Sequence, residues 1–193
     1  MERIFAANTV ARSDSVWHLP QAPRALPASY GFAGQSYDVA GFLDRTLTTG
    51  LLVLHRGRIT HEEYRLGADE TSLFTSWSVA KSVLSALIGI AIEDGHIRSV
   101  RDPVGAYVPA LAGSAYGAVP IEDVLTMSSG IAFNEDYESL FSDLNMVFLR
   151  TMAMRQPVEQ MLAGLPRLRD PGAFNGYISS DSMVLGLVLE GAT

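Results

Sequence analysis

The serine and lysine of Ser78-Val79-Ala80-Lys81 have the types and the spacing that nucleophilic chemistry needs. Side chains three residues apart lie on the same face of an α-helix. A serine hydroxyl is a weak nucleophile until a base removes its proton, and an unprotonated lysine can do this. At a helix N-terminus, the unsatisfied N–H groups and the dipole also favour developing negative charge. The pattern predicts Ser78 as an acyl-transfer nucleophile and Lys81 as its base.

The composition supports a chemical role for Lys81. It is the only lysine among 14 basic residues. Arginine stays protonated in proteins, whereas burial can lower the pKa of a lysine far enough for it to act as a base. Lysine depletion in an arginine-biased genome is one alternative explanation, and a lysine lying along an amphipathic helix is another.

A helix from about Ser78 to Asp94 must position this pair. Its apolar residues cover more than one face, so we expect it to be largely buried. Upstream, Leu51–His55 and Ile59–Tyr64 flank a glycine turn and predict a β-hairpin. The two histidines and two glutamates of this segment lack the HExxH spacing, so a solvated strand edge is predicted there and no metal site.

The chain divides into three predicted regions. Residues 1–37 contain Pro20, Pro23 and Pro27 and predict an irregular N-terminal arm. Residues 38–100 hold the hairpin and the nucleophile helix of an α/β lobe. Residues 101–193 contain short apolar segments separated by turns and predict a helical lobe. The expected class is therefore α+β.

The composition bounds the function. A hydrophobic fraction of 48% and a charged fraction of 18% over 193 residues are typical of a globular protein. The net charge of −7 argues against nucleic acid or an anionic membrane as a partner, and the absence of cysteine excludes disulfides and thiolate catalysis. No long apolar run or signal sequence is evident, so we expect a cytoplasmic protein that acts on a small molecule.

Two tyrosines lie in suggestive contexts. Tyr137 ends the polar segment Asn134-Glu135-Asp136-Tyr137, and Tyr177 precedes an apolar helical stretch. A phenol beside a cationic amine can have a lowered pKa and can relay a proton. Neither tyrosine is specific on the residues alone, since such a tyrosine is more often a packing residue.

Taken in order, the motifs resemble those of a known superfamily. Ser78-Val79-Ala80-Lys81 is followed by Thr126-Met127-Ser128-Ser129-Gly130, Pro171-Gly172 and Tyr177-Ile178-Ser179. Over residues 40–193 this order resembles the serine hydrolases that include class C β-lactamases, penicillin-binding DD-peptidases and related esterases. Asn-Glu-Asp-Tyr, and Tyr-x-Ser in place of Tyr-x-Asn, are most similar to the aminohexanoate-oligomer (nylon-oligomer) hydrolase branch.

The resemblance implies a β-lactamase/DD-peptidase-like fold with a sheet-bearing lobe and a helical lobe, and a role for each matched residue. Ser78 would be the acylated nucleophile, Lys81 its general base and Tyr177 a second proton shuttle. Tyr137 would contact the scissile amide, and Ser179 would bind substrate. The Ser78 N–H would donate to the oxyanion, and neither metal nor cofactor is expected.

The implied function is cleavage of an amide like that of aminohexanoate oligomers. A carboxylesterase and a catalytically silent acyl- or peptide-binding relative are the alternatives. Serine at position 179 makes β-lactam turnover a weaker expectation. The superfamily's third motif, Lys-Thr-Gly or a histidine equivalent, does not follow Tyr177. We therefore expect the C-terminal strands to be missing and this portion alone to be inactive or poorly stable; its oligomeric state stays open.

Overall fold

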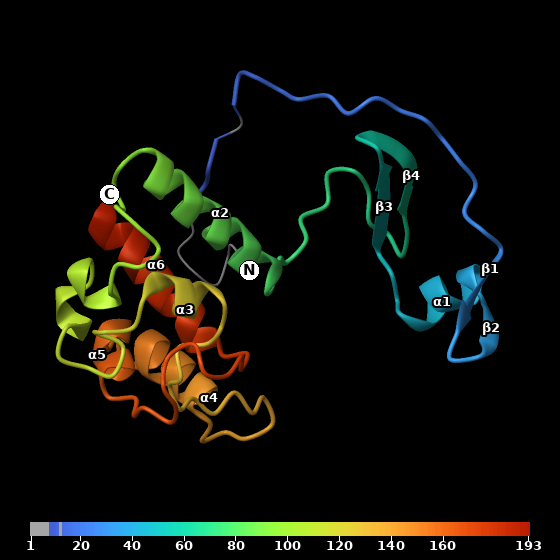
Figure 1. Cartoon of the computed structure of the whole chain (residues 1–193). Helices are drawn as coiled ribbons and strands as arrows, with labels where there is room; N and C mark the ends of the chain where they lie inside the picture. Colours follow the sequence, from blue (N-terminus) through green and yellow to red (C-terminus); the bar gives the residue numbers. More distant parts are fainter. Residues whose placement is uncertain (1–7, 12) are drawn as a thin grey trace. The chain divides into compact units, whose positions relative to one another are not determined.

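The computed structural model describes residues 8–11 and 13–193, which form two compact units that meet in sequence between Thr75 and Ser76. Each unit has its own elements (Figure 1). This division differs from the boundary predicted at residue 100. The helix that carries Lys81 packs against the last helix of the chain, so it groups with the helical region and not with the upstream hairpin.

The first unit contains two antiparallel hairpins and a short helix. Its elements are β1 (Ser29–Phe32), β2 (Gln35–Asp38), α1 (Val39–Arg45), β3 (Gly50–His55) and β4 (Arg58–Tyr64). The predicted hairpin at β3 and β4 is confirmed, with Gly50 opposite Tyr64 and His55 opposite Arg58. Arg56 and Gly57 join these strands with positive φ angles of 49° and 72°, as a two-residue hairpin turn requires.

The predicted irregular arm over residues 1–37 needs correction. Residues 29–32 pair with residues 35–38 as β1 and β2. Ala33 and Gly34 have φ angles of 50° and 77°, so they make the same kind of turn as in the second hairpin. The prediction rested on prolines, and these end before β1. Residues 1–7 and 12 of the predicted arm lie outside the described residues.

The second unit is built of helices, as predicted for residues 101–193. Its elements are α2 (Val79–Glu93), the 3₁₀ turns η1 (Val104–Ala106) and η2 (Pro109–Leu111), α3 (Ile121–Leu125), α4 (Asp143–Phe148), the π-helical turn η3 (Leu149–Ala153), α5 (Val158–Ala163) and α6 (Ser179–Ala192). Helix α6 lies against α2, α3 and α5 (Figure 1). The central position of α6 fixes the residues at its N-terminal end relative to α2.

The hydrophobic core of this unit surrounds α6. Fully buried side chains are contributed by α2, the 3₁₀ turns, α3 and α6 itself, and they include Ile88, Leu111, Ile121, Val184 and Val188. The expectation that α2 is largely buried is wrong for this unit. Only Ile88 and Ala91 of α2 are buried, because one face of the helix packs on α6 while apolar side chains such as Val83 and Ile90 remain exposed.

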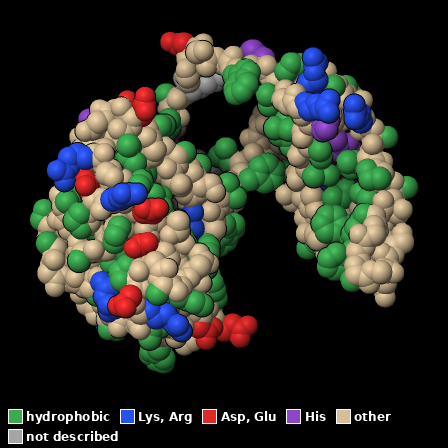
Figure 2. Space-filling view, viewed as in Figure 1, with side chains coloured by type: hydrophobic (Ala, Val, Ile, Leu, Met, Phe, Trp, Pro, Cys, Tyr) green, Lys and Arg blue, Asp and Glu red, His purple; other side chains and the backbone are tan. Residues whose placement is uncertain are grey.

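Acidic and basic side chains are interspersed on the visible face of the helical unit (Figure 2). Within residues 8–11 and 13–193, no helix combines the length and the apolar character needed to cross a bilayer.

Candidate active site

Ser78 lies at the junction between a sharp backbone turn and helix α2. Trp77, directly before it, has a φ of 44°, which is rare for a bulky side chain. Ser78 itself is the N-cap residue, with helical angles of −71° and −5° and no capping bond from its hydroxyl. Among the described residues, no acceptor takes the Ser78 N–H. The Ser78 N–H is therefore available to a ligand at the helix N-terminus, and the Ser78 hydroxyl is not used to cap its own helix.

The three residues predicted to be catalytic meet at Ser78 Oγ. Lys81 Nζ lies 3.2 Å from this oxygen, and the Tyr177 hydroxyl donates to it over 2.7 Å. Lys81 Nζ also lies 5.1 Å from the centre of the Tyr177 ring. The structure thus brings Tyr177, almost 100 residues away in sequence, into contact with the pair predicted on α2.

The environment of Tyr177 favours its ionised form. Its hydrogen bond with Ser78 lowers the pKa of the phenol, and contact with Lys81 lowers it further. A phenolate can accept a proton and a phenol can donate one, so Tyr177 is suited to carry a proton in either direction.

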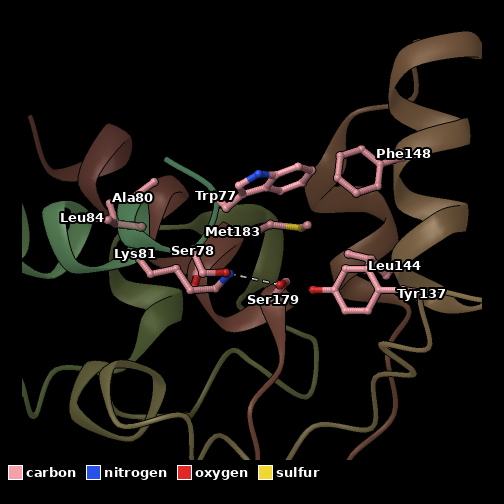
Figure 3. A pocket seen from close by; sticks show the side chains of 11 residues that line it. Trp77, Ser78, Ala80, Lys81, Leu84, Tyr137, Leu144, Phe148, Ser179 and Met183 are labelled. Carbon is pink, nitrogen blue, oxygen red and sulfur yellow. Dashed lines mark hydrogen bonds between the residues drawn. The ribbon is translucent and has the colours of Figure 1, made fainter. Parts of the chain in front are cut away.

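Ser179 and Tyr137 lie next to this cluster, and both hydrogen-bond to Glu135. Ser179 is the first residue of α6, and its Oγ lies 3.2 Å from Lys81 Nζ (Figure 3). The Ser179 hydroxyl donates to Glu135 Oε1 over 2.7 Å, and its backbone N–H donates to Glu135 Oε2. The Tyr137 hydroxyl donates to Glu135 Oε1 over 3.0 Å, which raises the pKa of Tyr137.

The sequence places Glu135 in the Asn134-Glu135-Asp136-Tyr137 segment and indicates no role for it. The signal that could have identified it is its place two residues before Tyr137 in a polar loop. That spacing alone does not reveal a contact with Ser179, which depends on how the loop folds over the start of α6.

A cavity of about 380 Å³ opens beside Ser78 and Lys81. Its apolar lining includes Trp77, Leu84, Leu144, Phe148 and Met183. In Figure 3 these side chains surround the space, and the Tyr137 hydroxyl points toward Ser179. Sequence reasoning missed this lining, because an apolar residue on a helix gives the same pattern whether it faces a core or a pocket. The cavity offers room for an apolar substrate group next to the nucleophile.

His, Asp and Glu side chains are the candidate metal ligands of this cysteine-free chain. Throughout the part of the chain that the structure describes, no group of three or more such side chains is arranged to hold a metal ion.

The fold that carries this cluster is of the β-lactamase type. Residues 35–193 match the Beta-lactamase family, and the chain belongs to that family. The superfamily resemblance and the expected fold class are thereby confirmed.

Individual relatives agree with this assignment. The chain is 32% identical over 162 residues to the 6-aminohexanoate-dimer hydrolase of Paenarthrobacter ureafaciens, an alignment that covers 81% of this chain and 41% of the relative. It is 25% identical over 96 residues to a Beta-lactamase of Pseudomonas fluorescens, covering 50% of this chain and 26% of the relative.

A solved structure shows the same fold. It is a Bacillus anthracis protein provisionally assigned as a 6-aminohexanoate-dimer hydrolase, with a TM-score of 0.78, 20% identity, and coverage of 93% of this chain and 50% of that one. The chain thus spans half or less of the length of each of these relatives.

Proposed function

We propose that the chain carries the nucleophilic centre of a serine hydrolase that cleaves amide bonds through an acyl-enzyme on Ser78. The observation that carries this proposal is the convergence of Lys81 Nζ and the Tyr177 hydroxyl on Ser78 Oγ, at 3.2 and 2.7 Å. A nucleophile within hydrogen-bond reach of a base that is itself held by a third group is the arrangement used for covalent catalysis.

In the proposed reaction, neutral Lys81 takes the proton of the Ser78 hydroxyl as Oγ forms a bond to the carbonyl carbon. The resulting oxyanion lies at the N-terminus of α2, where the Ser78 N–H can donate to it. Tyr177 then gives its proton to the leaving nitrogen, and the C–N bond breaks. A water molecule then attacks the acyl-enzyme and gives its proton to the Tyr177 phenolate, while Ser78 Oγ leaves with the proton that Lys81 returns to it.

The proposed substrate is a small amide of the aminohexanoate type. Two observations support it: the name of the relative that is 32% identical over most of this chain, and the apolar cavity beside the nucleophile. In this proposal, Tyr137 contacts the scissile amide and Ser179 contacts the substrate. The same groups could attack an ester, so rates on matched amide and ester substrates decide between an amidase and an esterase.

The test is the intact mass of the protein after treatment with a serine-reactive fluorophosphonate. We expect one adduct on the wild-type chain, none on Ser78→Ala, and one on Ser76→Ala, a matched control two residues away. An adduct that persists in Ser78→Ala would remove Ser78 as the nucleophile. A wild-type chain that forms no adduct would contradict the proposal for this chain, and reversible ligand binding without an adduct would favour the silent binding relative.

A further inference from the structure

Glu135 contacts Ser179 twice, once at the hydroxyl and once at the backbone. Its Oε1 accepts the Ser179 hydroxyl over 2.7 Å, and its Oε2 accepts the Ser179 N–H. Ser179 is about 9% exposed, so little water competes for these bonds. Two acceptors on one carboxylate, facing two donors of one residue, fix the orientation of that hydroxyl.

The direction of this hydrogen bond matters because a serine hydroxyl has one proton and two lone pairs, whereas an ionised carboxylate can only accept. The Ser179 proton must therefore point at Glu135. The Ser179 oxygen then faces Lys81 Nζ, 3.2 Å away, only as an acceptor.

This orientation affects the proposed base. A neutral lysine amine has two N–H donors and one lone pair, and only the lone pair can take a proton from Ser78. If the Ser179 hydroxyl were free to rotate, it could donate to that lone pair and occupy it. An acceptor at Ser179 instead engages an N–H of Lys81 and leaves the lone pair for Ser78, whose Oγ is also 3.2 Å from Nζ.

We propose that Glu135 is a positioning residue, which holds the Ser179 proton away from Lys81 and so keeps the lysine lone pair directed at Ser78. The proposal rests on the function proposed above and assigns Glu135 a part in it. Glu135 does not touch the reacting atoms and acts through Ser179. Its negative charge nevertheless affects two tyrosines of the site. It raises the pKa of Tyr137, and it partly offsets the effect of Ser78 and Lys81, which lower the pKa of Tyr177.

The discriminating variant is Glu135→Gln, which keeps the shape but provides one acceptor oxygen and one NH₂ donor. Its amide can satisfy only one of the two Ser179 donors. We expect the rate constant of fluorophosphonate labelling at Ser78 to fall by about tenfold, the effect of losing one hydrogen bond to a charged group. Glu138→Gln, which removes the same charge three residues further along the loop, should label within about twofold of wild type.

A second variant separates positioning from a loss of structure. Ser179→Ala removes the hydroxyl that would otherwise block the lysine lone pair. The double variant Glu135→Gln/Ser179→Ala should therefore label several-fold faster than Glu135→Gln alone. A purely structural role predicts the opposite, since the double variant loses more contacts. Labelling of Glu135→Gln at the wild-type rate, or a double variant no faster than the single one, would overturn the proposal.

One readout does not depend on catalysis. In a ¹H–¹⁵N NMR spectrum, the Ser179 amide proton should resonate downfield because it donates to a carboxylate, and it should move upfield in Glu135→Gln but not in Glu138→Gln. An unmoved Ser179 amide would overturn the contact itself. If the amide moves but the wild-type chain does not label, the proposed function fails while the Glu135–Ser179 contact stands.

Discussion

At the scale of single residues, the Ser78 oxygen has two neighbours that can exchange protons with it. Lys81 and Tyr177 both lie within hydrogen-bond distance, and neither is deeply buried. An amine is the stronger acceptor and a phenol the more readily available acid near neutral pH. This difference suits Lys81 to the attack step and Tyr177 to protonation of the leaving group.

The pH dependence of labelling tests the role of Tyr177. An ordinary tyrosine ionises near pH 10, and the contacts with Ser78 and Lys81 lower the pKa of Tyr177. As the pH rises through this lowered pKa, the phenolate becomes a second acceptor for the Ser78 proton, in addition to Lys81. We expect the fluorophosphonate labelling rate to rise in a step below pH 10, and Tyr177→Phe to lose that step.

Tyr137→Phe is the matched control for this experiment. The pKa of Tyr137 is raised above the usual value of 10.0, chiefly by its hydrogen bond to Glu135. Tyr137 therefore ionises above pH 10. The step below pH 10 should therefore persist in Tyr137→Phe. If it also persists in Tyr177→Phe, it belongs to another group and Tyr177 is not the second proton carrier.

At the scale of elements, sequence spacing predicted those contacts that form within a single helix. Ser78 and Lys81 are three residues apart, so their proximity follows from helix formation. The contact of Tyr177 with Ser78 joins residues 99 positions apart, and no periodicity encodes it; the superfamily resemblance supplied it. Glu135 and the apolar lining of the cavity were missed, since both depend on how a loop and several helices pack.

The packing of α6 can be tested with two glycines of the same helix. A Cβ at Gly191 would lie 2.1 Å from the carbonyl oxygen of Tyr107, whereas a Cβ at Gly186 would meet nothing within 4 Å. Gly186→Ala should stabilise the protein by about 0.5–1 kcal/mol, the usual helical preference for alanine. Gly191→Ala should destabilise it by about 1–3 kcal/mol, because α6 must move away from Tyr107.

Urea unfolding followed by circular dichroism measures both changes. Since the two substitutions are chemically identical and lie in one helix, propensity cancels in their difference. Equal effects at the two positions would mean that α6 does not approach the Tyr107 backbone this closely.

At the scale of the whole molecule, the residues of the proposed site all lie in the unit that begins at Ser76. Helix α6 contributes both to the proposed site and to the stability of this unit. Its N-terminal end supplies Ser179 to the site, and its later residues pack in the hydrophobic core. Asp181 lies in the first turn of α6, between Ser179 of the site and the core residues of the helix. It is fully buried, and its Oδ1 accepts the hydroxyl of buried Tyr116 over 2.8 Å.

Burial of Asp181 should make the stability of this unit depend on pH. Among the described residues, Oδ2 has no hydrogen-bond partner, and burial raises the pKa of the carboxyl from 3.8 to about 6. Tyr116 and Ser129 hydrogen-bond to this group, and no cation in the described part of the chain forms an ion pair with it. The folded state therefore binds the Asp181 proton more tightly than the unfolded state does.

The direction of this pH dependence follows from the difference between the folded and unfolded pKa values of Asp181. Because the folded pKa is the higher one, the stabilisation from proton binding is full below about pH 3.8 and is lost as the pH rises through about 6. One pKa unit corresponds to about 1.4 kcal/mol, so the whole effect is worth about 3 kcal/mol. Over this window the Asp181 contribution falls as the pH rises, opposite to that of a carboxylate in a salt bridge.

The measurement is the free energy of urea unfolding at several pH values between about 4 and 8, for wild type and Asp181→Asn. Asparagine cannot ionise, so the wild type should lose stability relative to the variant as the pH rises through about 6. Other groups titrate in both proteins and cancel in the difference. A difference that stays constant over this range would mean that Asp181 keeps an ordinary pKa, and that a partner for its second oxygen compensates the burial.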